Sequence, residues 1–592
     1  MQVLPQSLQR HARTPTGTQS VRELSRRRRI VAALNILTYA ALVLAFASVV
    51  GRNGWTLIDA LMLLCFMVGL PWTVLGFWNS LIGLMLLHTG KDARMRVAPF
   101  ADAGDAPDPI TLHTAVLMTL RNEDPARAFA RLKAVKRALD ATGFGGQFGY
   151  FILSDTNDEA VALAEETAFA AWKIREPRGT RLVYRRRTEN TGFKAGNVRD
   201  FCATWGGDYE LMLPLDADSL MDGPTIIRHV RMMQLHPKLG ILQSLVVGLP
   251  SDSAFARIFQ FGMRHGMRAY TMGSAWWIGD CGPFWGHNAL VRIKPFYEEC
   301  DLPVLPGGPP FGGAVLSHDQ VEATLMRRAG YEVRVLPEEG GSWEENPPTM
   351  LEFARRDVRW CQGNLQYLRL LDIPDLYIVS RFQLVWAILM FIGIPAWTAL
   401  IGLAALKPYD GEAGPFPTGA AIGLYLAFLA MSLSPKLCGL ADILLTKGGT
   451  ARYGGTGKFL LGAGIEIVFS FLQGAVSTLR TTIFMIGLVF GKSVVWGGQA
   501  RDAHGISWAT AFAGLWPQLV YGLLVLGAMV YAAPALALWS LPLTAGYLLA
   551  IPFAVYTADP ALGARMKQSG LNAIPEEADT PPIVRAIQQP EP

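Results

Sequence analysis

The chain has 592 residues, of which 51% are hydrophobic and 17% are charged, with a formal net charge of +5. Soluble globular domains carry about a quarter charged residues, so part of this chain is predicted to be solvated by lipid. The small net charge gives no indication of a nucleic-acid partner. The six cysteines show no CxxC or metal-ligand spacing, which argues against a disulfide framework or a zinc site.

Two apolar stretches follow a short N-terminal tail, residues 1–29, that ends in Arg26-Arg27-Arg28-Arg29. Residues 30–50 and 58–87 are each long enough to cross a bilayer core, which takes about 20 apolar residues. They predict a transmembrane hairpin over 30–90 that returns the chain to its starting side. A cleaved signal peptide is the alternative for 30–50, because Ala45-Phe46-Ala47 resembles a cleavage site, but the second span argues against it.

Residues 91–348 have the composition of a globular domain in which strands alternate with helices. Apolar runs at 113–119, 148–153, 182–184 and 210–215 predict buried strands of a parallel sheet. Polar residues follow the first two runs, with Asn122 and Glu123 after one and Asp155 after the other. Open α/β sheets bind ligands at the carboxyl ends of their strands, so we expect a site there, in which Asp155 accepts a bond from a nucleobase or ribose.

Asp216 and Asp218 directly follow the apolar run 211–215. Residues i and i+2 of a strand share a face, and two convergent carboxylates suit a hard divalent cation and, through it, a diphosphate. Lys194 lies in a glycine-flanked turn where its ammonium can approach a phosphate. Such a carboxylate pair is also found in caps and loops, and such a lysine in surface turns, but their combination and order favour a nucleotide site.

Three later segments complete the predicted site. Trp285 and His287 belong to a polar-aromatic turn. Asp319 directly precedes a predicted helix at 320–329, where a carboxylate can also be an ordinary cap. Residues 349–380 predict an interfacial amphipathic helix with its apolar side toward the membrane. The apolar stripe comprises Leu351, Ala354, Val358, Cys361, Leu365 and Leu368, and the face toward the cleft carries Arg356, Arg359, Trp360 and Asn364. A basic helix lying in lipid head groups is the alternative.

Residues 381–557 predict a second group of spans, at 382–406, 418–433, 516–531 and 535–556. The stretch 459–490, broken near Arg480 and carrying Glu466, predicts two short spans or an interfacial or re-entrant segment, which gives six to eight spans in all. Basic residues fall on one side with the arginine run, so the domain 91–348 and the tail 558–592 are predicted to be cytosolic. The loop 492–510, with Trp496 and Arg501, is predicted to fold over a bound nucleotide as a gate, or to be a plain connection.

These motifs, in this order, resemble the membrane-embedded processive glycosyltransferases of family 2, which include cellulose, chitin and hyaluronan synthases. The resemblance covers about residues 114–371 and extends into the flanking spans. Arg356 and Ser317-His318 depart from the Gln and Thr-Glu of cellulose-type synthases and fit the branch that makes osmoregulated periplasmic glucans. The motifs that mark this branch lie at 121–125, 153–158, 194–197, 284–289, 317–319 and 355–364.

The resemblance implies an α/β GT-A-type (Rossmann-like) cytosolic domain inserted in a transmembrane helical bundle of a Gram-negative inner membrane. It implies inverting, processive transfer of glucose from UDP-glucose, with Mg²⁺ or Mn²⁺, onto a growing β-glucan with β-1,2 linkages. The implied partners are the glucan, membrane lipids and a periplasmic glucan-processing protein. The implied site has Asp155 at the uridine, Lys194 at the diphosphate, Asp216 and Asp218 at nucleotide and metal, Asp319 as general base, Arg359 at the leaving diphosphate and Trp360 at the acceptor, with Asn122, Glu123, Trp285, His287, Arg356, Trp496 and Arg501 as further substrate contacts.

Three other functions stay open at this point. They are a cellulose-like synthase, a polyprenyl-phosphate glycosyltransferase, and a transporter with a nucleotide-binding domain. Arg359-Trp360 favours a polysaccharide acceptor over a lipid carrier. The acid-base residues and the weak internal repetition of the spans argue against a transporter.

Overall fold

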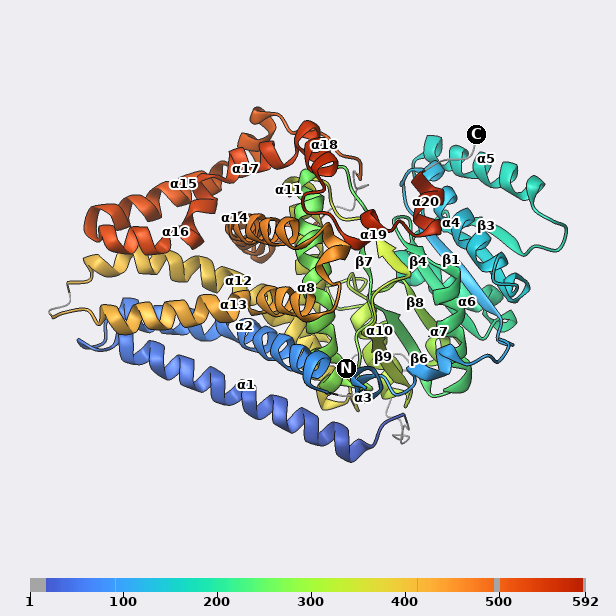
Figure 1. Cartoon of the computed structure of the whole chain (residues 1–592), viewed down its shortest axis with the longest axis horizontal. Coiled ribbons are helices and arrows are strands. Elements are labelled where there is room, and N and C mark those ends of the chain that lie inside the picture. Colours follow the sequence, from blue (N-terminus) through green and yellow to red (C-terminus); the bar gives the residue numbers. More distant parts are fainter. Residues whose placement is uncertain (1–17, 91, 412–413, 495–500, 589–592) are drawn as a thin grey trace.

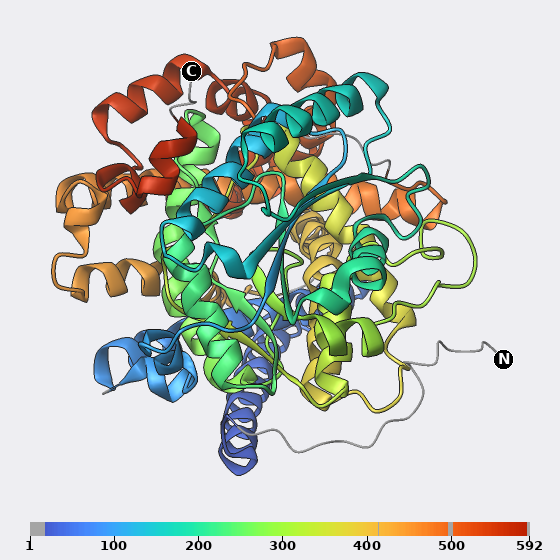
Figure 2. The same ribbon diagram turned by 90° about the vertical axis from the view of Figure 1, so that its right-hand side faces the viewer.

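The computed structural model describes residues 18–90, 92–411, 414–494 and 501–588. An α/β domain lies at one end of the molecule, and long helices project from it side by side (Figure 1). Figure 2 looks onto the α/β domain from the side opposite these helices. The two parts meet at a layer of helices that borders the candidate site.

A seven-stranded sheet forms the centre of the α/β domain. Its order is β3-β2-β1-β4-β8-β6-β9, with β1 Thr114–Leu120, β2 Phe148–Ser154, β3 Leu182–Arg186, β4 Leu211–Asp216, β6 Leu239–Ser244, β8 Ala289–Arg292 and β9 Glu332–Leu336. The four strands that the sequence predicts are all present. These four are parallel to one another, as predicted, and the sheet is mixed because β8, which the sequence analysis did not identify, runs antiparallel to both β4 and β6. A parallel strand needs a crossover back to the amino edge, whereas the chain enters β8 directly from the 285–288 turn at the carboxyl edge.

Alternating side chains bind helices to both faces of the sheet. Val116 and Met118 of β1 pack in one core with α4 (Pro125–Asp140) and α7 (Gly223–Leu235). Ala115 and Leu117 pack in a second core with α6 (Phe193–Trp205), α9 (Ile293–Glu299) and α10 (Asp319–Arg328). This period of two is the pattern of a strand buried on both sides. The carboxyl ends of β1, β2 and β4 are thereby left open for a site.

Six helices are long and apolar enough to cross a membrane: α1 (Val21–Val50), α2 (Leu57–Thr89), Ile378–Tyr409, which contains α12 (Ile378–Leu406), α13 (Thr418–Leu445), α14 (Thr456–Val489) and α15 (Trp508–Ala532). A pair bent by 58°, α16 (Pro534–Leu548) and α17 (Ala550–Thr557), brings the number to seven among the described residues. The span predicted for 535–556 falls on this bent pair.

The predicted break near Arg480 is wrong, because α14 is one uninterrupted helix. The ring of Phe459, near its start, lies 5.8 Å from that of Phe261 in α8, and Leu488, near its end, belongs to a core that also holds residues of α12. Its ribbon is strongly foreshortened in Figure 1, whereas the neighbouring bundle helices lie nearly in the plane of the view. The helix is long and apolar enough to cross a membrane, so one helix replaces the two short spans.

Two further helices, α8 (Ala254–Ile278) and α11 (Met350–Leu365), lie between the sheet and the bundle. The sequence analysis did not identify α8. A side chain on Gly83 of α2 would come within 1.7 Å of the Ala269 carbonyl oxygen, so glycine lets α2 and α8 touch backbone to backbone. In α11, Leu351 and Ala354 pack with residues of α14 and α15, whereas Cys361 and Leu365 pack in the second core of the sheet rather than toward the membrane. Leu368 lies beyond the helix and is 53% exposed.

The C-terminal tail is ordered against the α/β domain. Its helices are α18 (Pro560–Ser569), α19 (Pro575–Ala578) and α20 (Pro582–Gln588). Two buried arginines of α8 anchor α19, with Arg257 2.7 Å from Glu577 and Arg264 3.1 Å from Glu576. Ile583 and Val584 of α20 join the core beside α4. The sequence indicated only a tail here, because its partners are distant along the chain.

The arginine run before the first span does more than indicate topology. The Nη2 atom of Arg28 lies 2.5 Å from Oδ1 of Asp280, beyond the end of α8, and Nη2 of Arg327 in α10 lies 2.6 Å from Oδ2. Asp280 is 4% exposed. Burial raises the pKa of its carboxyl, but the two guanidinium groups outweigh burial and lower it. Asp280 thus ties α1 to the helix that begins with Asp319.

Asp280→Asn is expected to destabilise the protein by about 3–5 kcal/mol, because it leaves two arginines facing a neutral amide in a buried place. Thermal unfolding of the purified protein in detergent measures this. The control is Asp252→Asn, whose pair with Lys567 is exposed and contributes about 1 kcal/mol or less. Equal unfolding temperatures for the two variants would contradict the expectation.

Candidate active site

A cavity of about 1230 Å³ opens at the carboxyl ends of β1, β2 and β4. It continues past α8 and α11 to residues of the helical bundle. Its lining includes almost every site residue that the sequence analysis proposed: Asn122, Glu123, Asp155, Lys194, Asp216, Asp218, Trp285, His287, Asp319, Arg356, Arg359, Trp360 and Arg501. Trp496 lies outside the described residues.

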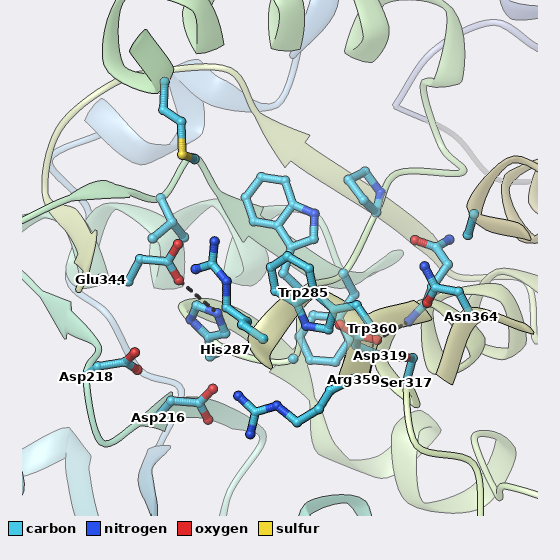
Figure 3. A pocket seen from close by; sticks show the side chains of 18 of the residues that line it. Asp216, Asp218, Trp285, His287, Ser317, Asp319, Glu344, Arg359, Trp360 and Asn364 are labelled. Atoms are coloured by element: carbon cyan, nitrogen blue, oxygen red, sulfur yellow. Dashed lines mark hydrogen bonds and ion pairs between the residues drawn. The ribbon is translucent and has the colours of Figure 1, made fainter. Parts of the chain in front are cut away.

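The carboxylate pair lies at the end of β4. Asp216 is the last residue of the strand and Asp218 is in the turn that follows (Figure 3). Lys194 forms an ion pair with Asp216, and the Thr119 hydroxyl donates a hydrogen bond of 3.2 Å to it. Burial opposes ionisation of Asp216, but Lys194 and His287 hold its pKa at about 2. Nη2 of Arg501 lies 2.6 Å from Oδ2 of Asp218. Each carboxylate therefore faces one cation from another segment.

Lys194 lies in the first turn of helix α6. The prediction of a glycine-flanked turn is therefore correct only before the lysine, because the residues after it are helical. Gly192 precedes the helix with φ of +70°, a conformation that favours glycine. Gly196 is already helical, and a side chain there would come within 2.0 Å of the Thr191 carbonyl oxygen. The lysine ammonium and the positive end of a helix thus face the cavity together, an arrangement that suits a phosphate.

Asp155 is held rigidly at the end of β2. Nε and Nη2 of Arg187 lie 2.7 and 2.8 Å from its two oxygens, and the Asn197 amide donates a bond of 2.8 Å to it. Asp155 is 4% exposed, so a ligand would meet a fixed and already paired carboxylate. The sequence analysis missed Arg187. Its only signal is its place as the last of three consecutive arginines at the end of β3.

Asn122 joins the loops that follow β1 and β2. Its side-chain oxygen accepts bonds of 3.1 Å from the backbone N–H groups of Asn157 and Asp158, which fixes the rim of the cavity. Burial, followed by the charges of Asp216 and Asp218, raises the pKa of Glu123 to about 7, against a backbone hydrogen bond from Arg121. Negative charge is therefore concentrated at this edge of the sheet.

Asp319 is the first residue of α10, and His318 occupies the cap position before it. One Asp319 oxygen accepts a bond of 3.0 Å from the Gln320 backbone N–H. The side chain therefore also helps to cap the start of the helix, which was the alternative role. Burial raises the pKa of Asp319, although His318 counteracts it. A Cβ on Gly286 would lie 3.5 Å from Cβ of Asp319 and 3.6 Å from Nζ of Lys194. Both are ordinary contacts, so glycine is favoured here by its φ of +79° and not by lack of space.

The 285–288 turn and strand β10 (Ser342–Glu344) close another side of the cavity. Nε2 of His287 lies 3.5 Å from Oε2 of Glu344, as Figure 3 shows by a dashed line. On its other side, Nδ1 of His287 is 3.2 Å from the Ser219 hydroxyl. Glu344 has no motif signal in the sequence, because it reaches the site through a small sheet in which β10 lies between β5 (Leu220–Met221) and β7 (Val247–Gly248).

Helix α11 supplies the aromatic and basic wall. The Arg356 guanidinium lies 4.7 Å from the centre of the Trp360 ring, and Trp360 remains 48% exposed toward the cavity. Arg359 extends from α11 toward Asp216 (Figure 3). Burial lowers the pKa of Arg359 to about 10, and the charges of Arg501 and Arg356 add to the effect. A flat apolar ring beside paired arginines suits a sugar next to a diphosphate.

A sheet with carboxylates at its carboxyl edge, a buried aspartate at a helix start and a Trp-Arg helix define the class of GT-A-type glycosyltransferases. Residues 211–434 match the family model for glycosyl transferase family group 2. Over 535 residues the chain is 38% identical to glucans biosynthesis glucosyltransferase H of Caulobacter vibrioides, spanning 86% of this chain and 79% of that protein. Over 590 residues it is 36% identical to the protein of the same name in Vibrio cholerae, spanning 96% and 80%.

The chain belongs to the glucans biosynthesis glucosyltransferase H family, which confirms the resemblance drawn from its motifs. It is a glycosyltransferase of glucan biosynthesis. Among solved structures, a mannosyltransferase of Pyrobaculum calidifontis in complex with GDP-Man and Mn²⁺ matches 62% of this chain and 99% of its own. The identity is 15% and the TM-score 0.36, so this likeness carries no argument about the site.

Proposed function

We propose that this protein polymerises glucose from UDP-glucose into a β-glucan at the cytosolic face of a bacterial inner membrane and passes the chain into its helical bundle. One observation carries the proposal. A single cavity joins the carboxylate pair, Asp319 and Trp360 to residues of the bundle. The basic residues beside the first span support the cytosolic orientation, and the β-1,2 linkage follows from the family resemblance.

The side chains divide the chemistry among them. The acceptor hydroxyl would lie on Trp360 and attack the anomeric carbon from the side opposite UDP, while Asp319 takes its proton. Arg359 and Lys194 would stabilise the charge that develops on the departing diphosphate. Asp155 and Asn122 hold the loops that face the nucleoside. The result is transfer with inversion, and the new terminal sugar becomes the next acceptor.

The carboxylate pair fits a divalent cation such as Mg²⁺ or Mn²⁺. The described residues contain no cluster of three His, Cys, Asp or Glu side chains that could hold a metal by themselves. Mg²⁺ commonly binds one or two carboxylates and completes its shell with substrate phosphates and water, which matches Asp216 and Asp218. When bound, the cation would neutralise charge on the diphosphate.

Release of UDP from UDP-glucose by the purified protein tests the proposal, and sizing of the product separates polymerisation from a single transfer. We expect a polymer whose linkage analysis gives β-1,2 bonds. A single lipid-linked glucose would instead indicate a polyprenyl-phosphate acceptor. Absence of UDP release, in a folded preparation supplied with Mg²⁺ or Mn²⁺, would overturn the proposal.

Arg501→Ala is expected to raise the KM for UDP-glucose by about 10-fold or more, a change typical of losing a hydrogen bond to a charged group. Arg501 spans the site, because it contacts Asp218 and donates a bond of 3.1 Å to the Glu345 carbonyl. We propose that the predicted gate acts through Arg501, in the described part of the loop after residue 500, which meets the nucleotide beside Asp218. The control is Arg585→Ala on the exposed side of α20. Unchanged kinetics in Arg501→Ala would show a plain connecting loop.

A further inference from the structure

A charged pair lines the cavity where two helices of the bundle, α13 and α14, border it. Lys436 of α13 forms an ion pair with Glu466 of α14, and both side chains line the cavity. The Ser470 hydroxyl donates a bond of 2.7 Å to the same Glu466 oxygen, Oε1. Glu466 is 2% exposed, and its other oxygen, Oε2, has no hydrogen-bond partner within the described part of the chain. The pair thus keeps an unused acceptor in a buried place.

Helix α8 is shaped to admit this carboxylate. A side chain on Gly262 would come within 2.3 Å of Oε1 of Glu466, so only glycine leaves the space. Burying a carboxylate costs free energy that one cation and one hydroxyl only partly offset. A pair with a purely structural role would be expected to use both oxygens, because an unpaired buried acceptor is destabilising.

The lining of the cavity as a whole matches the two kinds of surface that a sugar presents. Sugar rings carry apolar faces that stack on aromatic side chains and hydroxyl groups at their edges. Gln473 follows Glu466 along α14 and lines the cavity, and Trp386 lines it nearer the C-terminal end of α8, where it packs with Trp277. Adaptable Met263 and Met267 of α8 also line the cavity. Apolar walls with a few polar groups are typical of a small-molecule site.

We propose that Lys436 and Glu466 form a saccharide subsite where α13 and α14 border the cavity, which the ion pair closes when no chain is present. Hydroxyl groups of the growing glucan separate the pair, donating to Glu466 and accepting from Lys436. The chain is then held between successive transfers, so the subsite sets how many sugars are added before release. This inference rests on the proposed polymerase function and deepens it.

The test compares Glu466→Gln, Lys436→Met and the double variant Lys436→Met/Glu466→Gln with the unmodified full-length protein in nanodiscs. Initial UDP release reports transfer, and a pulse of labelled UDP-glucose followed by an unlabelled chase reports the length reached before release. We expect initial UDP release within about 2-fold of the unmodified protein. We expect chains about 10-fold shorter in all three variants, since losing a hydrogen bond to a charged group changes binding by about 10- to 100-fold.

The double variant separates the subsite from a structural ion pair. Replacing both partners of a buried pair is often neutral for stability, whereas removing one is not. A structural pair therefore predicts short chains in the single variants and normal length in the double variant, which would overturn the proposal. Normal length in Glu466→Gln would also overturn it. If a single variant does not fold, the double variant and Ser470→Ala carry the same comparison.

A matched control removes one partner of a buried pair outside the cavity lining. Asp59 of α2 is fully buried, and its Oδ1 lies 2.6 Å from Nζ of Lys407 near the first turn of that helix. Asp59→Asn is expected to lower thermal stability without shortening the product. If the product is also shorter in this control, chain length depends on the stability of the bundle, and the proposal of a saccharide subsite is wrong. Failure of the unmodified protein to release UDP would instead refute the proposed function.

Discussion

Replacing Asp319 by asparagine is expected to slow glucosyl transfer by about 10²–10⁴-fold, the usual contribution of a positioned general base. The asparagine keeps the shape of the side chain and cannot take the acceptor proton. UDP release at saturating UDP-glucose measures the loss. Binding of UDP, measured by calorimetry, is expected to stay within about 3-fold, because Lys194 and the carboxylate pair remain in place.

Asp222→Asn is the matched control for Asp319→Asn. Burial also raises the pKa of Asp222, but its side chain lies before α7 and outside the cavity lining. Its activity is expected to stay near that of the unmodified protein. Normal turnover in Asp319→Asn would remove Asp319 from the mechanism and leave its helix-end contact as its only role.

The raised pKa of Asp319 also predicts a pH dependence. Burial favours the protonated acid, so the ionised form that acts as a base is lost at a higher pH than for an exposed aspartate. Activity is therefore expected to fall on acidification while the protein is still folded. The acidic limb of a kcat profile measures this, and its disappearance in Asp319→Asn assigns the limb to this residue. A limb that persists in the variant would belong to another group.

Asp218→Asn is expected to lower transfer by about 10²-fold or more, because a bound cation contributes several kcal/mol of charge stabilisation at the diphosphate. Chelation of divalent cations should abolish the activity of the unmodified protein. Excess Mn²⁺ should restore part of the activity of the variant, since Asp216 remains. Activity titrated against Mn²⁺ concentration measures both effects.

Arg501→Ala separates the two proposed roles of Asp218, which are pairing with Arg501 and binding the cation. It removes the ion pair that Asp218 forms with Arg501 but leaves the carboxylate. Its dependence on Mn²⁺ should therefore match that of the unmodified protein, whereas Asp218→Asn shifts to higher concentrations. An identical metal dependence in Asp218→Asn and the unmodified protein would show that the carboxylate acts only through Arg501.

Much of the site was predictable from short stretches of sequence. The strand that ends at Asp216 is a continuous apolar run, and the polar residues after it must lie at the carboxyl edge. Asp319 and Trp360 were predictable because each lies at a fixed place in a helix with a clear pattern. The family membership followed from the order of these motifs. Such features depend on residues that are neighbours along the chain.

Other features depended on contacts that no local pattern encodes. The antiparallel direction of β8 depends on the edge at which the chain enters the sheet. The unbroken α14 tolerates Glu466 because Lys436 on another helix pairs with it. Arg187 and Glu344 reach the site only through pairings across the α/β domain.

The sequence by itself therefore determined the class of enzyme, the apolar helices and most of the polar residues that line the cavity, because hydrophobic periodicity and motif order are local properties. Only the tertiary structure decided which cation faces each carboxylate, how α8 and α14 border the cavity, and how the C-terminal helices hold the domain. Those choices depend on packing and charge pairing between segments that lie from about twenty to more than three hundred residues apart.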